Sequence, residues 1–229
     1  MIVELFGSPG SGKSTLVASM ESNDLILRSK FNYIYADNLH TSLSKKILIF
    51  YLFILHHPIV FIKLAKVTKD IKFINRLLII VVFSRLYQGI FEKNSGSVDI
   101  FDQNLSQWVW SLLYRRSANK NNDYIVDFLK YVFNKVDRIC IFVSIEVELL
   151  DLINRLKSRK NGHSPIESGN IESVERSVKC HTATLNIIND LCSMSDKLHL
   201  IEVSPHKKEA VINKTAEKIL IFCENIFNK

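Results

Sequence analysis

Short apolar segments recur along the chain, and longer stretches with helical spacing separate them. The segments are residues 2–6, 32–36, 97–101, 138–144 and 198–203. Short apolar or β-prone runs of this kind are typical of strands that are buried on both faces of a parallel sheet. A helical pattern over residues 209–227 follows the last of them. The alternation of strands and helices predicts an α/β fold with a mainly parallel five-stranded sheet and helices on both faces.

The segment between the second and third predicted strands is unusually apolar. Residues 42–88 have a helical pattern, with apolar runs at residues 47–55 and 77–83. Neither run reaches the roughly 20 residues that a membrane-spanning helix needs. We expect these helices to be buried against the sheet. The alternative is an interfacial helix that rests on an anionic bilayer, helped by four lysines, which are Lys45, Lys46, Lys63 and Lys66.

Composition is that of one folded domain. The 229 residues are 47% hydrophobic and 23% charged, which predicts a packed core and leaves little room for a second domain. The net charge of +7 fits nucleic acid, an anionic membrane or phosphate-bearing substrates. Since no dense Lys/Arg block with interleaved aromatic residues occurs, we do not expect nucleic acid binding.

The cysteines and the first residues bear on the compartment. The four cysteines are scattered without paired metal spacing and are expected to be reduced thiols; they are Cys140, Cys180, Cys192 and Cys223. Only a short apolar run precedes the first glycine, and a secretory signal needs a longer one. We therefore expect a cytoplasmic protein.

The first predicted strand runs directly into a glycine-rich loop that matches the full pattern G-x-x-x-x-G-K-[ST] between a strand and a helix. Its glycines let backbone N–H groups turn towards phosphate oxygens, and the helix N-terminus adds its unpaired N–H groups. Lys13 is expected to bridge the β- and γ-phosphates, and the Ser14 hydroxyl to bind Mg²⁺. The sequence thus predicts a nucleoside triphosphate site and the three-layer sandwich of P-loop NTPases. The loop residues are Gly7, Ser8, Pro9, Gly10, Ser11, Gly12, Lys13, Ser14 and Thr15.

Two aspartates end predicted strands. Asp37 follows residues 32–36, and Asp102 follows residues 97–101. The carboxyl ends of strands form the rim where open α/β sheets bind ligands. Asp102 is a candidate to orient Mg²⁺ or to accept a proton, and its alternative role is to cap the next helix. Asp37 is a candidate acceptor contact, with a plain turn as the alternative.

A second motif raises the question of a GTPase. Residues 134–137 fit N-K-x-D, the guanine-reading pattern of GTPases. In GTPases this motif follows a strand, but here it precedes the strand at residues 138–144 and ends the helical run at residues 124–133. We expect it at the edge of the sheet opposite the nucleotide. No D-x-x-G follows the third predicted strand, so a kinase is favoured.

Several segments, taken in order, resemble the thymidylate kinase-like and deoxynucleoside kinase-like branch of P-loop kinases. Residues 82–88 resemble the helix whose arginine reaches the acceptor, and that arginine is Arg85 here. Residues 201–205 resemble the last strand and the loop that passes the adenine ring. The pair that follows the third strand, Asp102 and Gln103, departs from the acidic residue and arginine of that family. The resemblance implies a kinase, and the departure argues against thymidine monophosphate as its acceptor.

A candidate lid follows the fourth predicted strand. Arg155 and Arg159 are spaced four residues apart, which puts them on one helical face. They resemble the Arg-x-x-x-Arg lid of the same kinases, and glycines at 162 and 169 follow. Such a lid closes its cations over the transferring phosphoryl group. The alternative is an exposed basic helix end.

Together these features predict one P-loop kinase domain over residues 1–229, with a helical apolar insertion at about residues 42–90 and a lid at about residues 155–172. We expect it to transfer the γ-phosphoryl group of ATP, with Mg²⁺, to a nucleoside, nucleotide or sugar-type acceptor. An NTP-hydrolysing regulatory switch that acts through a protein partner is the alternative. Peripheral membrane contact and a homodimer are compatible with the sequence. The residues expected to act are Lys13, Asp102, Arg155 and Arg159 in catalysis, Ser14 and Asp102 at the metal, and Asp37 and Arg85 at the acceptor.

Overall fold

The computed structural model describes residues 1–27, 31–34, 43–91, 98–116, 122–158, 171–204 and 209–227. Its strands form a single sheet in the order β2-β3-β1-β4-β5, and every pairing is parallel. The predicted α/β class and the five-stranded sheet are confirmed, although the fourth strand begins two residues later than predicted. The strands are β1 (Ile2–Phe6), β2 (Phe31–Ile34), β3 (Val98–Phe101), β4 (Cys140–Ile145) and β5 (Leu198–Val203).

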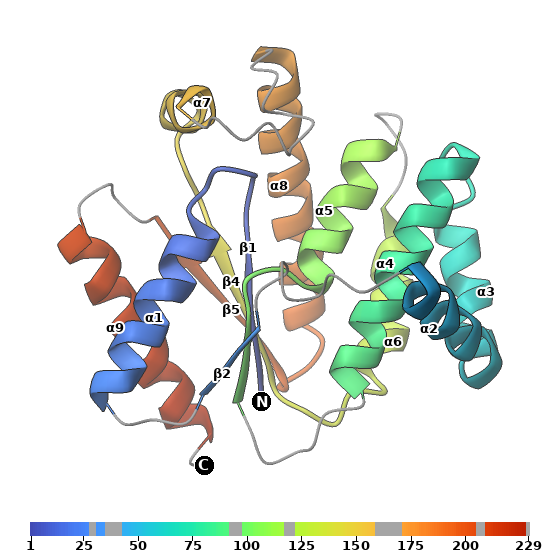
Figure 1. Ribbon diagram of the computed structural model, residues 1–229, viewed down its shortest axis with the longest axis horizontal. Coiled ribbons are helices and arrows are strands. Elements are labelled where there is room, and N and C mark those ends of the chain that lie inside the picture. Colours follow the sequence, from blue (N-terminus) through green and yellow to red (C-terminus); the bar gives the residue numbers. More distant parts are fainter. Residues whose placement is uncertain are drawn as a thin grey trace.

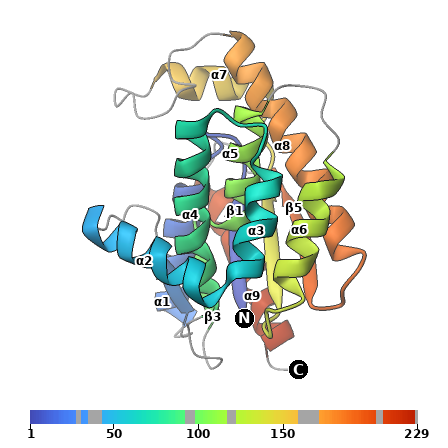
Figure 2. The ribbon, with the colours of Figure 1, turned by 90° about the vertical axis from the view of Figure 1, so that its right-hand side faces the viewer.

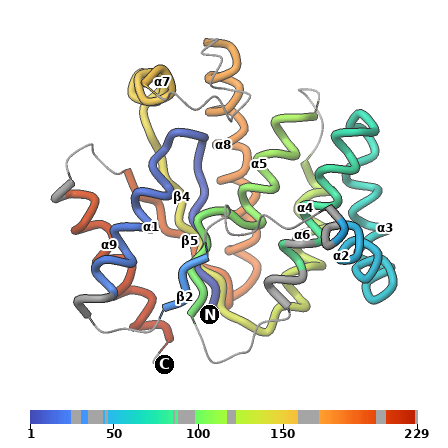
Figure 3. Tube along the Cα trace, in the orientation of Figure 1, coloured from blue at the N-terminus to red at the C-terminus, as the bar shows by residue number. Residues whose placement is uncertain are grey.

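Helices cover both faces of the sheet, as the alternation of strands and helices predicted. Helices α1 and α9, from opposite ends of the chain, lie side by side on one face (Figure 3). Helices α4, α5, α6 and α8 lie on the other face, with α2 and α3 packed farther out (Figure 1). The described helices are α1 (Lys13–Leu27), α2 (Leu43–His56), α3 (Pro58–Val67), α4 (Phe73–Phe91), α5 (Leu105–Arg115), α6 (Asp123–Phe133), α7 (Leu149–Lys157), α8 (Ile171–Cys192) and α9 (Glu209–Phe227).

The central strand β1 contributes to the cores on both faces. Successive side chains of a strand point to opposite faces, so Val3 and Leu5 pack in the cluster with α1 and α9. Ile2 and Phe6 pack in the cluster that α4, α5, α6 and α8 form. Glu4 is on the same side as Ile2 and Phe6 and is buried there. A strand that is covered on both faces holds the loop at its carboxyl end in a fixed place.

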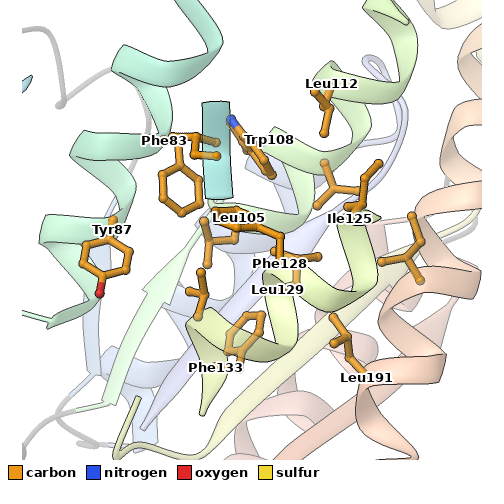
Figure 4. Packing of buried hydrophobic residues seen from close by; sticks show 14 of the residues in the cluster. Phe83, Tyr87, Leu105, Trp108, Leu112, Ile125, Phe128, Leu129, Phe133 and Leu191 are labelled. Atoms are coloured by element: carbon orange, nitrogen blue, oxygen red, sulfur yellow. The ribbon is translucent and has the colours of Figure 1, made fainter. Parts of the chain in front are cut away.

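The inner side of the apolar insertion is part of this core. Phe53 of α2 contacts Phe83 and Tyr87 of α4, with ring centroids 6.0 and 5.4 Å apart. Phe83 in turn lies 4.9 Å from Trp108 of α5 and 5.0 Å from Phe128 of α6, again between ring centroids. Figure 4 shows Phe83, Tyr87, Trp108 and Phe128 gathered in one cluster. The predicted burial of the insertion is confirmed for this side.

The outer side of the insertion is not buried, and there the prediction was wrong. Ile47, Tyr51 and Leu55 of α2 are 60, 59 and 57% exposed. The first part of α2 extends away from the rest of the molecule (Figure 2). A helix that is apolar on all sides needs partners on all sides, but among the described helices α2 has its main contacts with α3 and α4.

No helix in the described part of the chain is long and apolar enough to cross a bilayer by itself. The segments Ile47–His56 and Pro58–Val67 meet the length and composition criteria together, but they are bent by 109° relative to each other.

Candidate functional site

The glycine-rich loop connects the carboxyl end of β1 to the first turn of α1. A Cβ atom at Gly7 would lie 2.7 Å from Ser11 Oγ and 2.8 Å from the carbonyl oxygen of Ile145, so no larger residue fits there. Gly12 has a φ of 99°, a conformation that side chains with a Cβ rarely adopt. The loop therefore has its shape because these positions lack side chains.

Lys13 is the first residue of α1 and is only 7% exposed. Its Nζ donates hydrogen bonds to the carbonyl oxygens of Gly7 at 2.8 Å and Ser8 at 3.2 Å. The ammonium group is thus held inside the loop, next to the unpaired N–H groups of the helix N-terminus. Together they form a concentrated positive site for phosphate oxygens.

Ser14 and Asp102 meet at the rim of the sheet. Asp102 follows β3, which neighbours β1, and the Ser14 hydroxyl donates a hydrogen bond to its Oδ2 at 3.4 Å. Mg²⁺ prefers oxygen ligands and is commonly held by one or two protein oxygens together with water and substrate phosphates. This donor set fits Mg²⁺. Capping of the following helix α5 involves Glu4, which accepts a hydrogen bond from the backbone N–H of Ser106 at 2.6 Å.

Helix α7 brings Arg155 to the same loop. Its Nη1 donates a hydrogen bond to the carbonyl oxygen of Ser11 at 3.0 Å. Leu152 and Leu156 of α7 lie 3.2 Å from the position that a Cβ atom would have at Gly10. Arg155 thus lies beside the glycine-rich loop, which we call the phosphate loop from here on. Its role in catalysis stays a prediction.

Three other predicted site residues cannot be compared in this way. Asp37 and Arg159 lie outside the described residues, as does most of the predicted lid at residues 155–172. Arg85 belongs to α4, but its side chain is also outside the described part of the molecule. Their roles stay predictions.

His181 of α8 is a residue that the sequence did not reveal. Its Nε2 lies 3.3 Å from Ser144 Oγ, and its ring centroid lies 5.6 Å from that of Phe6. Burial and the neighbouring Lys13 cation lower the pKa of His181 to about 4, so the imidazole is neutral near pH 7. A neutral histidine behind the loop adds no second charge against Lys13. No motif marks it, because it lies within an ordinary amphipathic helix pattern.

Glu4 is a second buried group that the sequence analysis did not single out. Burial raises the pKa of its carboxyl group to about 7, although hydrogen bonds from the backbone of Leu105, Ser106 and Gln107 act in the opposite direction. These residues form the first turn of α5, where unpaired N–H groups favour a carboxylate. Glu4 therefore ties α5 to β1, three residues before the phosphate loop begins.

A cavity of about 340 Å³ lies between α4 and α5. Asn104 has both polar side-chain atoms buried without a hydrogen-bond partner in the described part of the protein, and so does Gln107 at its Oε1. Buried polar groups are usually paired, so three unpaired amide atoms on residues that line a cavity are unusual. The cavity begins one residue after Asp102. It is lined by Leu78, Ile79, Val82 and Leu86 of α4 and by Gln103, Asn104, Gln107, Trp108, Ser111 and Arg115 of α5 and its N-terminal turn.

The N-K-x-D segment, residues 134–137, lies far from this site. It precedes β4, whose register with β1 pairs Ile2 with Cys140 and Phe6 with Ser144. Because the strands are parallel, this segment lies at the edge of the sheet opposite the phosphate loop, as predicted. Its Asp137 is exposed and forms an ion pair with Lys197, with a nitrogen–oxygen distance of 2.7 Å.

No family model and no curated protein matches the chain. Solved structures do match over nearly its whole length. The structure of deoxyadenosine kinase from M. mycoides with the products dCMP and a flexible dCDP has a TM-score of 0.53 and 17% identity, covering 99% of this chain and 100% of that one. The structure of the same kinase with bound dATP has a TM-score of 0.55 and 15% identity, covering 98% of this chain and 100% of that one. The structure with bound dCTP has a TM-score of 0.52 and 16% identity, covering 96% of this chain and 98% of that one.

These similarities concern the fold, because identities of 15–17% do not extend to individual site residues. They agree with the parallel sheet and the helices on both of its faces. The chain therefore has the three-layer α/β fold of P-loop deoxynucleoside kinases.

Proposed function

We propose that the protein is a kinase that transfers the γ-phosphoryl group of ATP to a nucleoside. The observation that carries this proposal is the cavity beside Asp102, where buried amide atoms of Asn104 and Gln107 have no hydrogen-bond partner among the described residues. A switch that only hydrolyses nucleotide has no need of a ligand-sized cavity beside Asp102. A kinase must hold an acceptor there.

The chemistry of the cavity favours a nucleoside over a sugar. Its α4 wall is apolar and its α5 wall carries amides, and amide side chains offer a donor and an acceptor that match the edge of a nucleobase. The volume is within the range of small-molecule sites. Deoxyadenosine kinases of similar fold have been solved with deoxynucleotides bound, which supports the same class of acceptor.

On the donor side, Lys13 and the N-terminus of α1 would bind the phosphates of ATP. Ser14 and Asp102 would hold Mg²⁺, which neutralises charge on those phosphates. Arg155, already in contact with the loop at Ser11, would stabilise the charge of the phosphoryl group in flight. Because the transition state of phosphoryl transfer is loose, alignment and charge neutralisation matter more than proton abstraction.

The test is a product screen by mass spectrometry. The protein is incubated with ATP, Mg²⁺ and a mixture of nucleosides, deoxynucleosides, nucleoside monophosphates and sugars. We expect a phosphorylated nucleoside, formed by the wild type and by the control variant Lys218→Ala, which changes an exposed lysine of α9. Lys13→Ala should form no product, while its circular dichroism spectrum stays that of the wild type. Hydrolysis of ATP without any phosphorylated acceptor would refute the proposal and favour the switch.

A second variant tests the cavity itself. Gln107→Leu removes the amide whose Oε1 is buried but keeps most of the side-chain volume. If the cavity holds the nucleoside, KM for the nucleoside should rise about tenfold or more, since a polar group that recognises substrate is worth about 1–3 kcal/mol, and KM for ATP should stay within a few-fold. Equal changes for both substrates would contradict this assignment.

A further inference from the structure

The outer side of the insertion exposes apolar side chains at helical spacing. Successive turns of α2 contribute them, and two more follow on α3 after the bend at His57 and Pro58. Soluble proteins rarely leave such a contiguous apolar area uncovered unless it is an interaction site. We call these residues the outer face; they are Ile47, Leu48, Tyr51, Leu52 and Leu55 of α2 and Ile59 and Ile62 of α3.

The apolar insertion as a whole, from α2 to α4, also holds the entire net charge of the protein. Residues 43–91 contain eight of the 30 Lys and Arg residues but only one of the 23 Asp and Glu residues, Asp70. Their net charge is therefore +7, and the 22 basic and 22 acidic residues of the remaining chain cancel. Lys66, Lys69 and Lys72, at the end of α3 and in the turn before α4, are exposed.

These two properties together narrow the choice of partner. A second copy of the chain docked on the outer face would bring two positively charged segments against each other, since residues 43–72 hold six basic residues and one acidic residue. The repulsion between like charges opposes such a contact. An anionic bilayer instead attracts the lysines and accepts the apolar side chains into its interface. Apolar residues on helices next to a cluster of lysines are the pattern of a protein that lies on a membrane surface.

We propose that the outer face of α2 and α3 binds the surface of an anionic phospholipid bilayer. The apolar side chains enter the interfacial region, and Lys66, Lys69 and Lys72 contact the lipid phosphates. The phosphate loop is at the carboxyl edge of the sheet, on a different element, so it does not take part. This inference does not depend on the proposed kinase activity, and its test involves no turnover.

The test is flotation of the purified full chain with vesicles of phosphatidylcholine alone or of phosphatidylcholine mixed with phosphatidylglycerol. We expect the protein to float with the anionic vesicles at low salt and to be released at high salt, because screening weakens the lysine contacts. Failure to float with anionic vesicles would overturn the proposal, and so would equal flotation with neutral vesicles.

Two sets of substitutions locate the surface. The triple variant Ile47→Ser, Tyr51→Ser and Leu55→Ser should abolish flotation. Its matched control changes three exposed apolar residues elsewhere and should float like the wild type; the control is Ile171→Ser, Met194→Ser and Ile221→Ser. Urea unfolding of both variants shows whether they are folded.

The lysines are tested separately, with no change to the apolar face. Since each lysine near an anionic surface strengthens binding by roughly fivefold, Lys66→Gln, Lys69→Gln and Lys72→Gln together should weaken it by more than tenfold. The control replaces three exposed lysines of α8 and α9 by glutamine and should bind like the wild type; they are Lys179, Lys214 and Lys218. If neither triple variant changes flotation, the assignment of this surface is wrong. A dimer in sedimentation that the apolar triple variant dissociates, without flotation of the wild type, would assign the surface to a second copy.

Discussion

The buried residues His181 and Glu4 should give the protein an unusual pH profile, because their pKa values are shifted in opposite directions. Burial and the Lys13 cation lower the pKa of His181 from 6.5 to about 4. Burial raises the pKa of Glu4 from 4.5 to about 7. In the acidic range between these values, the unfolded chain holds a proton on His181 that the folded chain lacks. The folded chain holds one on Glu4 that the unfolded chain lacks.

The two groups change the free energy of unfolding with opposite sign. For His181 the unfolded state binds more protons, so stability falls as the pH drops from about 6.5 to about 4. For Glu4 the folded state binds more protons, so stability falls as the pH rises from about 4.5 to about 7. Since a tenfold change in proton affinity is worth about 1.4 kcal/mol, each group contributes about 3 kcal/mol across its range. In the wild type the two contributions nearly cancel.

Single substitutions should separate them. Between about pH 8 and about pH 5, His181→Gln should gain about 2 kcal/mol of stability relative to the change in the wild type, and Glu4→Gln should lose about 2 kcal/mol. Urea unfolding at the two pH values measures this, and the double variant should return to the profile of the wild type. His56→Gln is the control, because His56 is exposed, and its profile should match that of the wild type. If His181→Gln has the same pH dependence as the wild type, our description of His181 as a buried neutral group beside Lys13 is wrong.

Further predictions concern the proposed kinase chemistry. Asp102→Asn removes a charge from the proposed metal site, so it should raise the Mg²⁺ concentration at half-maximal rate about tenfold or more; an unchanged Mg²⁺ titration would exclude the metal role. Arg155→Ala should lower kcat about tenfold with only a few-fold change in ATP affinity. Lys218→Ala should leave both kcat and ATP affinity unchanged, and equal losses of rate and affinity in Arg155→Ala would make Arg155 a ground-state contact. ATP should bind more tightly than GTP in a competition assay, because residues 134–137 lie at the far edge of the sheet; tenfold tighter GTP binding, about 1.4 kcal/mol, would revive the GTPase interpretation.

The parts of the site that the sequence predicted are those whose signals are local. The loop at residues 7–15 needs only its own glycines, Lys13 and Ser14, together with a strand before it and a helix after it. Asp102 was predicted for a similar reason, since carboxyl ends of parallel strands meet at one rim. The contact between Ser14 and Asp102 follows once β1 and β3 are neighbours.

The residues that the sequence analysis missed depend on packing between distant segments. His181 reaches the loop only because α8 runs behind it, where the carbonyl oxygen of Ser177 accepts hydrogen bonds from Ser8 Oγ at 3.5 Å and Trp110 Nε1 at 3.1 Å. Glu4 reads as one polar position in an apolar strand, and nothing nearby shows that it faces the N-terminus of α5. Asn104 becomes a candidate site residue only once α4 packs beside α5 and forms the cavity that Asn104 lines.

The apolar insertion shows a different limit. The hydrophobic composition of a helix predicts that its surface is shielded from water, but it does not show whether the same chain or a binding partner shields it. Phe53 packs against Phe83 and Tyr87, whereas Ile47 and Tyr51 are exposed. Apolar residues on the two sides of α2 therefore have different surroundings, because a helix on the outside of a three-layer fold packs against its neighbours with one side.

The bond between Glu4 and the first turn of α5 bears on alignment of the two proposed substrates. The phosphate loop is the direct continuation of β1, and α5, which carries Asn104 and Gln107, is fastened to the same strand three residues earlier. The positions of both proposed substrates are thus set by the same strand, β1. A displacement of α4 or α7 would therefore leave the distance between the phosphate loop and the first turn of α5 unchanged. Misplacement of the substrates by about 1 Å can cost a hundredfold in rate. Because both binding elements are attached to β1, the sequence and position of the surrounding helices can differ without changing the distance between donor and acceptor.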